Sequence, residues 1–462
     1  MVNSLFADTK TRVMSDEILA RFKEEFNRDP EYHKAMYDKY LPVFRKEAID
    51  IDRLFSIHDE AYIQEVTYFL MYSAKKLVSN YIKPKPDFTD LKNLLDLDLE
   101  RLPELKDLSL THGLSFCDAF TKEHRLACPI VGKGNSQAIK LLKDDYGLYK
   151  ATLKACYFHR TKVTPKAVLR TVEMLVPVVS NFKPVVAAKI WYDYAVKQAL
   201  EAGRDYVALL VSSEGWLGRL LSGYKIAYDF PQLKVYYVSV DPNPLVNREF
   251  HNMVKTLREY HDLPNWFPET HMTGSENFRE LPKGTNYQYD MQFTSPPYFN
   301  TEVYMEGYII TLDDSTEIVL ADNEDIEVQG ENKYEPCKVI SVTELELGMI
   351  TSYGGTVVSI KNTGQSHNTS GTAEEWRVNF LLATYKCHKD IIKPGGYTIT
   401  NIANVRSCMK LEEYTVRSGL EAGFEYLGES WYKLSRKPSK NKNSEITSRA
   451  GEPIFIFRNP VE

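Results

Sequence analysis

The spacing of hydrophobic and polar positions changes three times along this chain. Up to about residue 160, apolar side chains recur every three or four positions, most clearly in residues 62–72, a pattern typical of amphipathic helices. Beyond that point, helical patterns alternate with short runs rich in Val, Tyr and Leu, which predicts βαβ units around a parallel sheet. Residues 305–364 hold short strand-like runs separated by acidic or glycine-containing turns. We therefore expect a helical accessory region over 1–160, an α/β domain built from 161–304 and 365–462, and an all-β insertion over 305–364.

The strand signals are runs of β-branched and aromatic residues bounded by turn formers. In the α/β domain they predict strands at 206–211, 234–240, 289–293, 397–402 and 453–457. A helix is predicted at 373–388, followed by a glycine turn at 393–396. In the insertion they predict strands at 308–312, 317–320, 338–342 and 356–360.

Composition narrows the class of protein. The chain has 462 residues, of which 43% are hydrophobic, so it can bury a large core. Its formal net charge of -6 means that any contact with nucleic acid must come from local basic surface. The six cysteines include no Cys-x-x-Cys pair, which argues against a zinc site and a disulfide framework. No run approaches the roughly 18 apolar residues of a membrane span, so we expect a soluble intracellular protein.

Residues 294–299, Thr-Ser-Pro-Pro-Tyr-Phe, carry the clearest chemical signal. They follow the predicted strand 289–293, and open α/β sheets hold ligands at the carboxyl ends of their strands. Ser295 offers a hydroxyl, Tyr298 a flat ring, and consecutive prolines offer carbonyl acceptors without backbone N–H donors. A planar amine could donate to Ser295 and the Pro296 carbonyl while it stacks on Tyr298, leaving the nitrogen lone pair free to attack. Against the alternative of a plain proline turn, the motif predicts methyl transfer to an amine, with the catalytic residues Ser295, Pro296, Pro297 and Tyr298.

A second group of residues has the order expected of a nucleoside-cofactor site. The first two predicted strands flank a Gly-x-x-Gly turn at Gly215 and Gly218, where a ligand could approach the backbone closely. Asp241 ends the second of these strands, and an acidic side chain there can accept hydrogen bonds from both ribose hydroxyls. This arrangement suits S-adenosylmethionine. A helix-starting pair of glycines with only a structural role is the alternative for the turn taken alone.

Six segments in order resemble the amino-methylating DNA methyltransferases of prokaryotes and phages, over about residues 163–462. They are 181–189 (Asn-Phe-Lys-Pro-Val-Val-Ala-Ala-Lys), 215–220 (Gly-Trp-Leu-Gly-Arg-Leu), 241–243, 294–299, 393–396 and 452–458. The resemblance implies a Rossmann-like class I methyltransferase sheet in an α/β protein with a helical N-terminal region. It also implies transfer of a methyl group from S-adenosylmethionine to N4 of cytosine or N6 of adenine, on a base flipped from double-stranded DNA.

The same resemblance implies which residues hold the cofactor and where the protein works. The expected cofactor contacts are Asn181, Phe182, Glu214, Gly215, Trp216, Gly218, Arg219, Asp241 and Glu276. No metal is expected, and the implied compartment is the cytoplasm of a bacterium or of a phage-infected cell, where a restriction partner could accompany the enzyme. A basic loop before the last predicted strand could follow the DNA backbone through Lys437, Lys440 and Lys442, with a solvated loop as the alternative.

Two departures from the family pattern keep other functions open. The first predicted strand ends in Val211-Ser212-Ser213-Glu214 and lacks the family's acidic residue, which Glu214 could replace from the next turn. The β insertion separates 300–304 from 365–368, which resemble two halves of one family segment. The insertion is either a target-recognition or clamp module or a β domain without a role in the chemistry. The rival functions are a catalytically silenced fold that binds DNA or protein and an RNA base methyltransferase.

Overall fold

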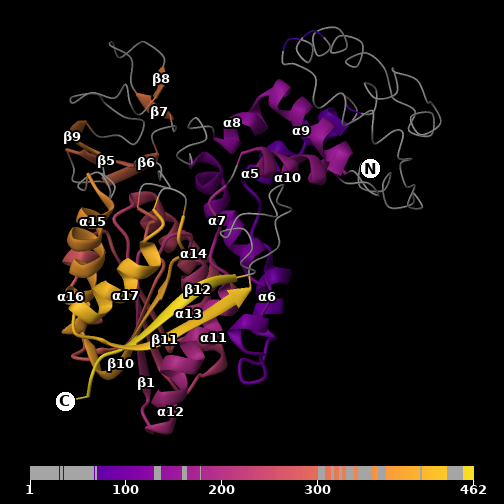
Figure 1. Ribbon diagram of the computed structural model, residues 1–462. Coiled ribbons are helices and arrows are strands. Elements are labelled where there is room, and N and C mark those ends of the chain that lie inside the picture. The colour runs from indigo at the N-terminus through magenta and orange to yellow at the C-terminus, as the bar shows by residue number, and fades with distance from the viewer. Residues whose placement is uncertain are drawn as a thin grey trace. The chain divides into compact units, whose positions relative to one another are not determined.

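The structure of the protein is a computed structural model that describes 70–128, 137–158, 164–176, 178–299, 307–313, 317–321, 325–328, 338–341, 356–362, 371–405, 408–433 and 451–461, with the single positions 31, 35 and 67. The chain divides into two compact units, one formed by 1–85 with 122–179 and the other by 86–121 with 180–462 (Figure 1). No helix in the described stretches combines the length and the apolar character that crossing a membrane requires.

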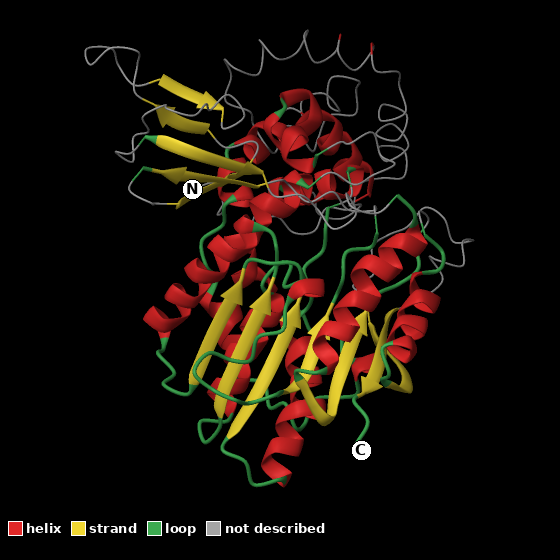
Figure 2. Cartoon of the chain, turned by 90° about the vertical axis from the view of Figure 1, so that its left-hand side faces the viewer, coloured by secondary structure: helices red, strands yellow, loops and turns green. Residues whose placement is uncertain are grey.

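The larger unit is built on a seven-stranded sheet with the order β11-β12-β10-β4-β1-β2-β3 (Figure 2). The strands β3, β2, β1, β4 and β10 are parallel, and β12 runs antiparallel to both of its neighbours. Counted along the chain, the last of the seven strands is thus inserted antiparallel between the fifth and the sixth. This order and direction define the Rossmann-like sheet of class I methyltransferases, which confirms the predicted fold class. The strands are β1 Tyr206–Ser212, β2 Lys234–Val240, β3 Trp266–His271, β4 Tyr289–Thr294, β10 Ile392–Asn401, β11 Glu425–Lys433 and β12 Gly451–Arg458.

Helices cover both faces of this sheet, so β1 is a nearly continuous apolar run and every residue of β4 is buried, including the polar Asp290 and Gln292. Leu209 and Val211 of β1 share a core with α11 Pro184–Trp191, α13 Gly218–Asp229 and α14 Pro244–Tyr260. Ala208 and Leu210 of the same strand face the opposite core. That core is formed with α15 Ala373–Trp376, the π-helix η6 Arg377–Leu382, α16 Ala383–Lys389 and α17 Leu411–Glu421 (Figure 1). Beyond α11 the same helix continues as the π-helix η2 Tyr192–Val196 and α12 Lys197–Glu201.

The predicted strands of the α/β domain are all present, but two strands were not predicted. In β3, Pro268 interrupts the apolar pattern, and only Trp266 is buried, because the strand lies at the edge of the sheet. In β11 most residues alternate between exposed and partly buried, so the strand lacks the continuous burial that marks β1 and β4. Edge strands are covered on fewer sides, and their sequences are correspondingly less distinctive.

The described residues of the insertion form β-strands in two groups. A three-stranded antiparallel sheet has the order β6-β5-β9, and a separate hairpin pairs β7 with β8. The strands are β5 Gly307–Leu312, β6 Glu317–Ala321, β7 Asp325–Val328, β8 Lys338–Ser341 and β9 Val357–Asn362, of which only β7 was not predicted. Both β5 and β6 contact α14, which begins at the carboxyl edge of the large sheet.

The smaller unit is helical in its described part, as the sequence pattern predicts. Its helices are α5 Val78–Ile82, α8 Ala138–Lys143, α9 Asp145–Phe158 and α10 Pro165–Leu175, together with the last turns of α7 Leu114–Ala127. The start of α10 is marked in the sequence by Thr164 and Pro165. The Thr164 hydroxyl accepts from the Ala167 N–H at 3.2 Å, and Pro165 occupies the first helical position.

Residues 86–121 belong to the sheet unit, so the division of the structure differs from the boundary predicted at residue 160. Their helix α6 Phe88–Leu95 and the short turn η1 Leu105–Asp107 bury leucines in the same core as β1 and α13. Lys225 of α13 reinforces this packing: its side chain is fully buried and donates to the carbonyls of Leu95 at 2.9 Å and Leu97 at 2.6 Å. The ammonium also pairs with Asp229 at 2.6 Å.

Replacing Lys225 with Met should destabilise the sheet unit by about 3 to 5 kcal/mol, because Asp229 and two carbonyls would lose their buried partner. Urea unfolding followed by tryptophan fluorescence measures this loss. The matched control is Lys234→Met, which removes the exposed pair with Asp205 and should change the free energy of unfolding far less, because water screens an exposed ion pair. Equal losses in the two variants would contradict the role given to Lys225.

Candidate active site

The candidate site lies at the carboxyl edge of the sheet, where the ends of four strands meet. Ser212, the last residue of β1, pairs with Val240 of β2 on one side and with Thr294 of β4 on the other. Thr294 in turn pairs with Thr400 of β10. After β1 the chain continues to β2 on one side of the sheet, whereas after β4 the next strand of this sheet, β10, lies on the other side, and open α/β sheets bind ligands at such a switch point. The turn after β1, Asp241, the 295–298 loop and Asn401 therefore lie along one edge.

The turn between β1 and α13 is held in an unusual backbone conformation. Ser213, Gly215 and Leu217 have φ values of 61°, 65° and 65°, in the left-handed region that favours glycine. Gly218 is required for a different reason, since a Cβ there would lie 2.1 Å from the carbonyl oxygen of Phe182. The segment before α11 is thereby packed directly against the turn.

Asn181 strengthens this packing, because its side-chain amide donates to the Trp216 carbonyl at 2.7 Å. The other atom of that amide, Asn181 Oδ1, is buried and has no hydrogen-bond partner in the described part of the chain. The structure therefore brings together the predicted cofactor residues Asn181, Phe182, Gly215, Trp216 and Gly218.

Arg219 places a buried positive charge under the turn. Its Nη2 donates to the carbonyls of Ser213 at 2.5 Å and Glu214 at 2.7 Å. The guanidinium carbon lies 5.8 Å and 5.5 Å from the ring centroids of Phe182 and Phe293, which is a cation–π arrangement. Nε and Nη1 find no hydrogen-bond partner among the described residues. Arg219 thus fixes the turn and retains spare donors for an anionic group.

Glu214 is turned into the protein rather than toward the edge of the sheet. Its side chain is only 1% exposed, and its two carboxylate oxygens accept from the Leu220 N–H at 3.1 Å and the Tyr237 hydroxyl at 2.6 Å. Burial raises the pKa of Glu214 to about 7, although nearby Arg219 and these two hydrogen bonds favour the charged form. This position favours a structural role, joining the start of α13 to β2, over a contact with the cofactor.

Asp241 is held rigidly at the end of β2. Its carboxylate accepts from the Gly215 N–H at 3.0 Å and the Asn243 N–H at 2.9 Å. The side chain of Asn247 donates to the Asp241 carbonyl at 2.8 Å, which fixes the backbone as well. Burial raises the pKa of Asp241 to about 6, against the opposing effect of the two N–H donors and of Arg219. Asp241 therefore offers an oriented carboxylate beside the glycine turn.

Glu276 lies on the short turn η3 Ser275–Asn277, which follows β3. Its Oε2 is buried without a hydrogen-bond partner within the described stretches, and its backbone carbonyl accepts from the Cys387 thiol at 2.6 Å. A Cβ on Gly274 would lie 2.4 Å from Glu276 Oε1, so glycine allows the carboxylate to fold back on its own turn. Among the described residues, no hydrogen bond or ion pair links Glu276 to Asp241.

The sequence predicts two proline carbonyls as acceptors in the 295–299 loop, but one of them is already engaged in a hydrogen bond. The Phe299 N–H donates to the Pro297 carbonyl at 2.8 Å, which closes a tight turn centred on Tyr298. Phe299 itself has a φ of 52° and packs its ring against Trp376, with the centroids 6.3 Å apart. The Pro296 carbonyl accepts no hydrogen bond from the described residues. Pro296 therefore supplies the available acceptor, beside the partly buried side chains of Ser295 and Tyr298.

Asn401, at the end of β10, is a site residue that the sequence interpretation missed. The Ser295 hydroxyl lies 3.4 Å from Asn401 Oδ1, and the pairing of Thr294 with Thr400 brings the two residues together. A polar residue one position before the end of the predicted strand 397–402 was the available signal, since parallel strands end at the same edge. Tyr432 of β11, whose ring centroid lies 5.1 Å from that of Phe182, was missed because β11 was not predicted.

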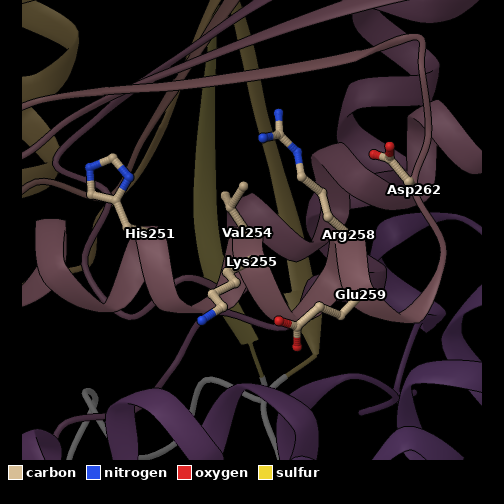
Figure 3. Close-up of a pocket in the computed structure, with 6 residues that line it drawn as sticks. All are labelled: His251, Val254, Lys255, Arg258, Glu259 and Asp262. Carbon is tan, nitrogen blue, oxygen red and sulfur yellow. The ribbon is translucent and has the colours of Figure 1, made fainter.

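Other predicted residues lie elsewhere. Lys437, Lys440 and Lys442 fall outside the described residues. A surface hollow of about 430 Å³ lies along α14 and contains none of the predicted site residues (Figure 3). Its lining residues are His251, Val254, Lys255, Arg258, Glu259 and Asp262.

Comparison with known proteins gives structural likeness only, since neither a known protein family nor a curated protein matches the sequence. The N-methyltransferase NodS from Bradyrhizobium japonicum WM9, solved in complex with S-adenosyl-L-homocysteine, is 10% identical with a TM-score of 0.27, and the alignment covers 57% of this chain and 83% of that one. A methyltransferase from Pyrococcus furiosus is 14% identical with a TM-score of 0.29, over 61% and 84% of the two chains.

A putative class I S-adenosylmethionine-dependent methyltransferase from Listeria monocytogenes is 13% identical with a TM-score of 0.31, over 80% of this chain and 87% of that one. TM-scores this low do not by themselves establish a common fold. The assignment to the class I methyltransferase fold therefore rests on the order and direction of the seven strands.

Replacing Glu214 with Gln should remove a pH dependence of stability. Because the pKa of Glu214 is raised in the folded protein, its contribution to the free energy of unfolding is complete below pH 4.5, the ordinary pKa of a glutamate. That contribution is lost as the pH rises through about 7. Relative to the variant, the wild type should therefore lose up to about 3 kcal/mol of unfolding free energy between about pH 5 and about pH 8. Denaturant unfolding at the two pH values measures the difference.

The control for this experiment is Glu413→Gln, which removes an exposed carboxylate on α17. It should leave the change in stability between the two pH values as it is in the wild type. If Glu214→Gln also leaves that change intact, Glu214 does not titrate in this range and the account of its burial is wrong.

Proposed function

We propose that this protein is an S-adenosylmethionine-dependent methyltransferase that methylates the exocyclic amine of a base in DNA. The observation that carries the proposal is the placement of two kinds of site on adjacent strand ends of a class I methyltransferase sheet. On one side of the switch point lies an oriented carboxylate beside a glycine turn, and on the other lies the Ser-Pro-Pro-Tyr loop, whose Pro296 carbonyl accepts no hydrogen bond from the described residues.

The residues beside β1 and β2 fit the two ends of the cofactor. The Asp241 carboxylate keeps acceptor capacity for ribose hydroxyls after binding two N–H groups, because each carboxylate oxygen has two lone pairs. Asn181 Oδ1 and the Nε and Nη1 of Arg219 are buried polar atoms without partners in the described stretches. Such atoms are costly to bury, so a ligand that pairs with them is favoured. We assign an acceptor role toward the methionine ammonium to Asn181 and a donor role toward the carboxylate to Arg219.

The residues beside β4 fit an amine. Ser295 and the Pro296 carbonyl would orient the two N–H groups, and Tyr298 would stack on the attached ring. When bound, the cofactor would supply an electrophilic methyl carbon on a sulfonium sulfur. The amine would take up that methyl group, the sulfur would keep the electron pair of the C–S bond, and one amine proton would pass to solvent. The protein contributes alignment of the nitrogen with that carbon, without a covalent protein intermediate.

A base in double-stranded DNA is the substrate that we favour, because the ordered motifs resemble those of the amino-methylating DNA methyltransferases. The target base would be flipped out of the duplex, at a cost of a few kcal/mol, to reach the Tyr298 ring. Cytosine N4 and adenine N6 both have the required NH2 group. Lys437, Lys440 and Lys442 are the proposed contacts to the DNA backbone.

The insertion is poorly suited to contact with phosphate. Residues 305–364 contain twelve Asp and Glu against three Lys and Arg. A target-recognition role for the insertion would therefore have to use base or shape contacts rather than the phosphate backbone.

A silenced methyltransferase fold that binds DNA or protein is the second candidate. The observation that favours it is the lack of an available carboxylate after β1. The strand ends in Ser212, and both carboxylate oxygens of the nearby Glu214 accept hydrogen bonds inside the protein. Arg219 nevertheless favours cofactor binding. Its Nε and Nη1 have no partner among the described residues, so this cation could bind the carboxylate of the methionine end of the cofactor, although no acidic residue ends β1.

Transfer of labelled methyl groups from S-adenosylmethionine to unmodified genomic DNA, followed by nucleoside analysis, tests the proposal. The wild type should form N4-methylcytosine or N6-methyladenine. Ser295→Ala should lower the rate about tenfold and Tyr298→Ala about tenfold to hundredfold, as expected from loss of stacking. Tyr228→Ala, which truncates a solvent-exposed tyrosine of α13, is the matched control and should retain wild-type activity.

The same preparation is offered RNA and protein in parallel. Label in RNA instead of DNA would support the RNA base methyltransferase. No transfer to any of the three, together with no binding of S-adenosylhomocysteine by calorimetry, would favour the silenced fold.

A further inference from the structure

The orientation of the Asn401 side chain is fixed by the strand beside it. Its Nδ2 donates to the carbonyl of Pro453 in β12 at 3.0 Å, and the residue is only 1% exposed. A carbonyl oxygen can only accept, so the NH2 group of the amide must face Pro453. The amide oxygen, Oδ1, is consequently the atom directed at Ser295.

This orientation decides what the Ser295 hydroxyl can do. An amide oxygen has no proton to give, so the hydroxyl is the donor in the contact with Asn401 Oδ1. A hydroxyl has a single proton, and once it points at Asn401 only lone pairs remain for a ligand. The distance of 3.4 Å is long, as catalytic hydrogen bonds often are before a ligand binds.

We propose that Asn401 is a positioning residue that holds the Ser295 hydroxyl as a hydrogen-bond acceptor and so makes the site selective for a group with two N–H donors. The inference rests on the proposed amine methylation. With the Ser295 hydroxyl oriented in this way, Ser295 Oγ and the Pro296 carbonyl form a pair of acceptors. A base that presents a carbonyl in place of the NH2 group would meet two acceptors and no donor.

Without Asn401 the hydroxyl can rotate, because Ser295 has no other hydrogen-bond partner among the described residues. It could then donate its proton toward the site and present the wrong polarity to an amine. Removing Asn401 should consequently matter only while the hydroxyl of Ser295 is present.

A double-mutant cycle tests this dependence. The rate kcat of methyl transfer to DNA is measured at saturating S-adenosylmethionine for the wild type, Asn401→Ala, Ser295→Ala and the double variant. Asn401→Ala should lower kcat about tenfold in the wild-type background, the effect of one hydrogen bond of ordinary strength, and by less than about twofold in the Ser295→Ala background. The KM for S-adenosylmethionine should stay unchanged.

Two further variants separate positioning from stability. Thr400→Val removes the neighbouring buried hydrogen bond to the Tyr385 hydroxyl at 2.6 Å and does not touch Ser295. It should lower the Tm while leaving kcat near that of the wild type. Asn401→Asp keeps an acceptor for Ser295 and loses the donor to Pro453, so it should retain more activity than Asn401→Ala despite a lower Tm.

Equal losses of kcat from Asn401→Ala in the two backgrounds would overturn the inference and leave Asn401 a purely structural residue, with the proposed function intact. A wild type that transfers no methyl group to any nucleic acid would overturn both.

Discussion

The hydrogen bond from the Gly215 N–H to the Asp241 carboxylate is the contact on which the candidate site depends. It joins the turn after β1 to the end of β2, and it does so in a turn with three residues of positive φ. Two of these, Ser213 and Leu217, are not glycine, and such conformations cost on the order of 1 to 3 kcal/mol each. The surrounding bonds stabilise that conformation: Arg219 binds two carbonyls of the turn, and Glu214 anchors the helix that follows.

Because the sheet fixes the register of its strand ends, the two halves of the proposed chemistry can come from distant parts of the chain. The nucleoside side is built from the ends of β1 and β2, and the amine side from the ends of β4 and β10. The β insertion begins beyond the loop of Ser295 to Phe299, and its strands β5 and β6 contact α14. The first turns of α14 carry Asn247, which holds the Asp241 backbone. The insertion is thus connected by sequence to the amine side and by packing to the nucleoside side.

The sequence predicts the parts of this structure that depend on local order. The strand β1 is buried on both faces and is a nearly continuous apolar run; Gly215 follows it within a short turn, and Asp241 comes directly after β2. The edge strands β3 and β11 escape prediction because their residues are half exposed. The helical pattern over residues 1–160 does not specify which core each helix joins, so the place of residues 86–121 in the sheet unit could not be foreseen.

Long-range contacts explain the remaining misses within the site. Asn401 meets Ser295 through the register of β4 and β10, which are separated by about a hundred residues of chain. The Glu214 side chain points into the protein, where it accepts from the Tyr237 hydroxyl on the next strand and follows a residue of positive φ, Ser213. Neither feature can be predicted from the pattern of apolar and polar residues.

The most direct test of the central claim is a crystal structure of the protein grown with S-adenosylhomocysteine. The account predicts the ribose hydroxyls on the Asp241 carboxylate, the adenosine beside the Gly215 turn, and the sulfur directed at the Ser295 to Tyr298 loop. A ligand bound elsewhere, or bound at this edge with its ribose away from Asp241, would contradict the account.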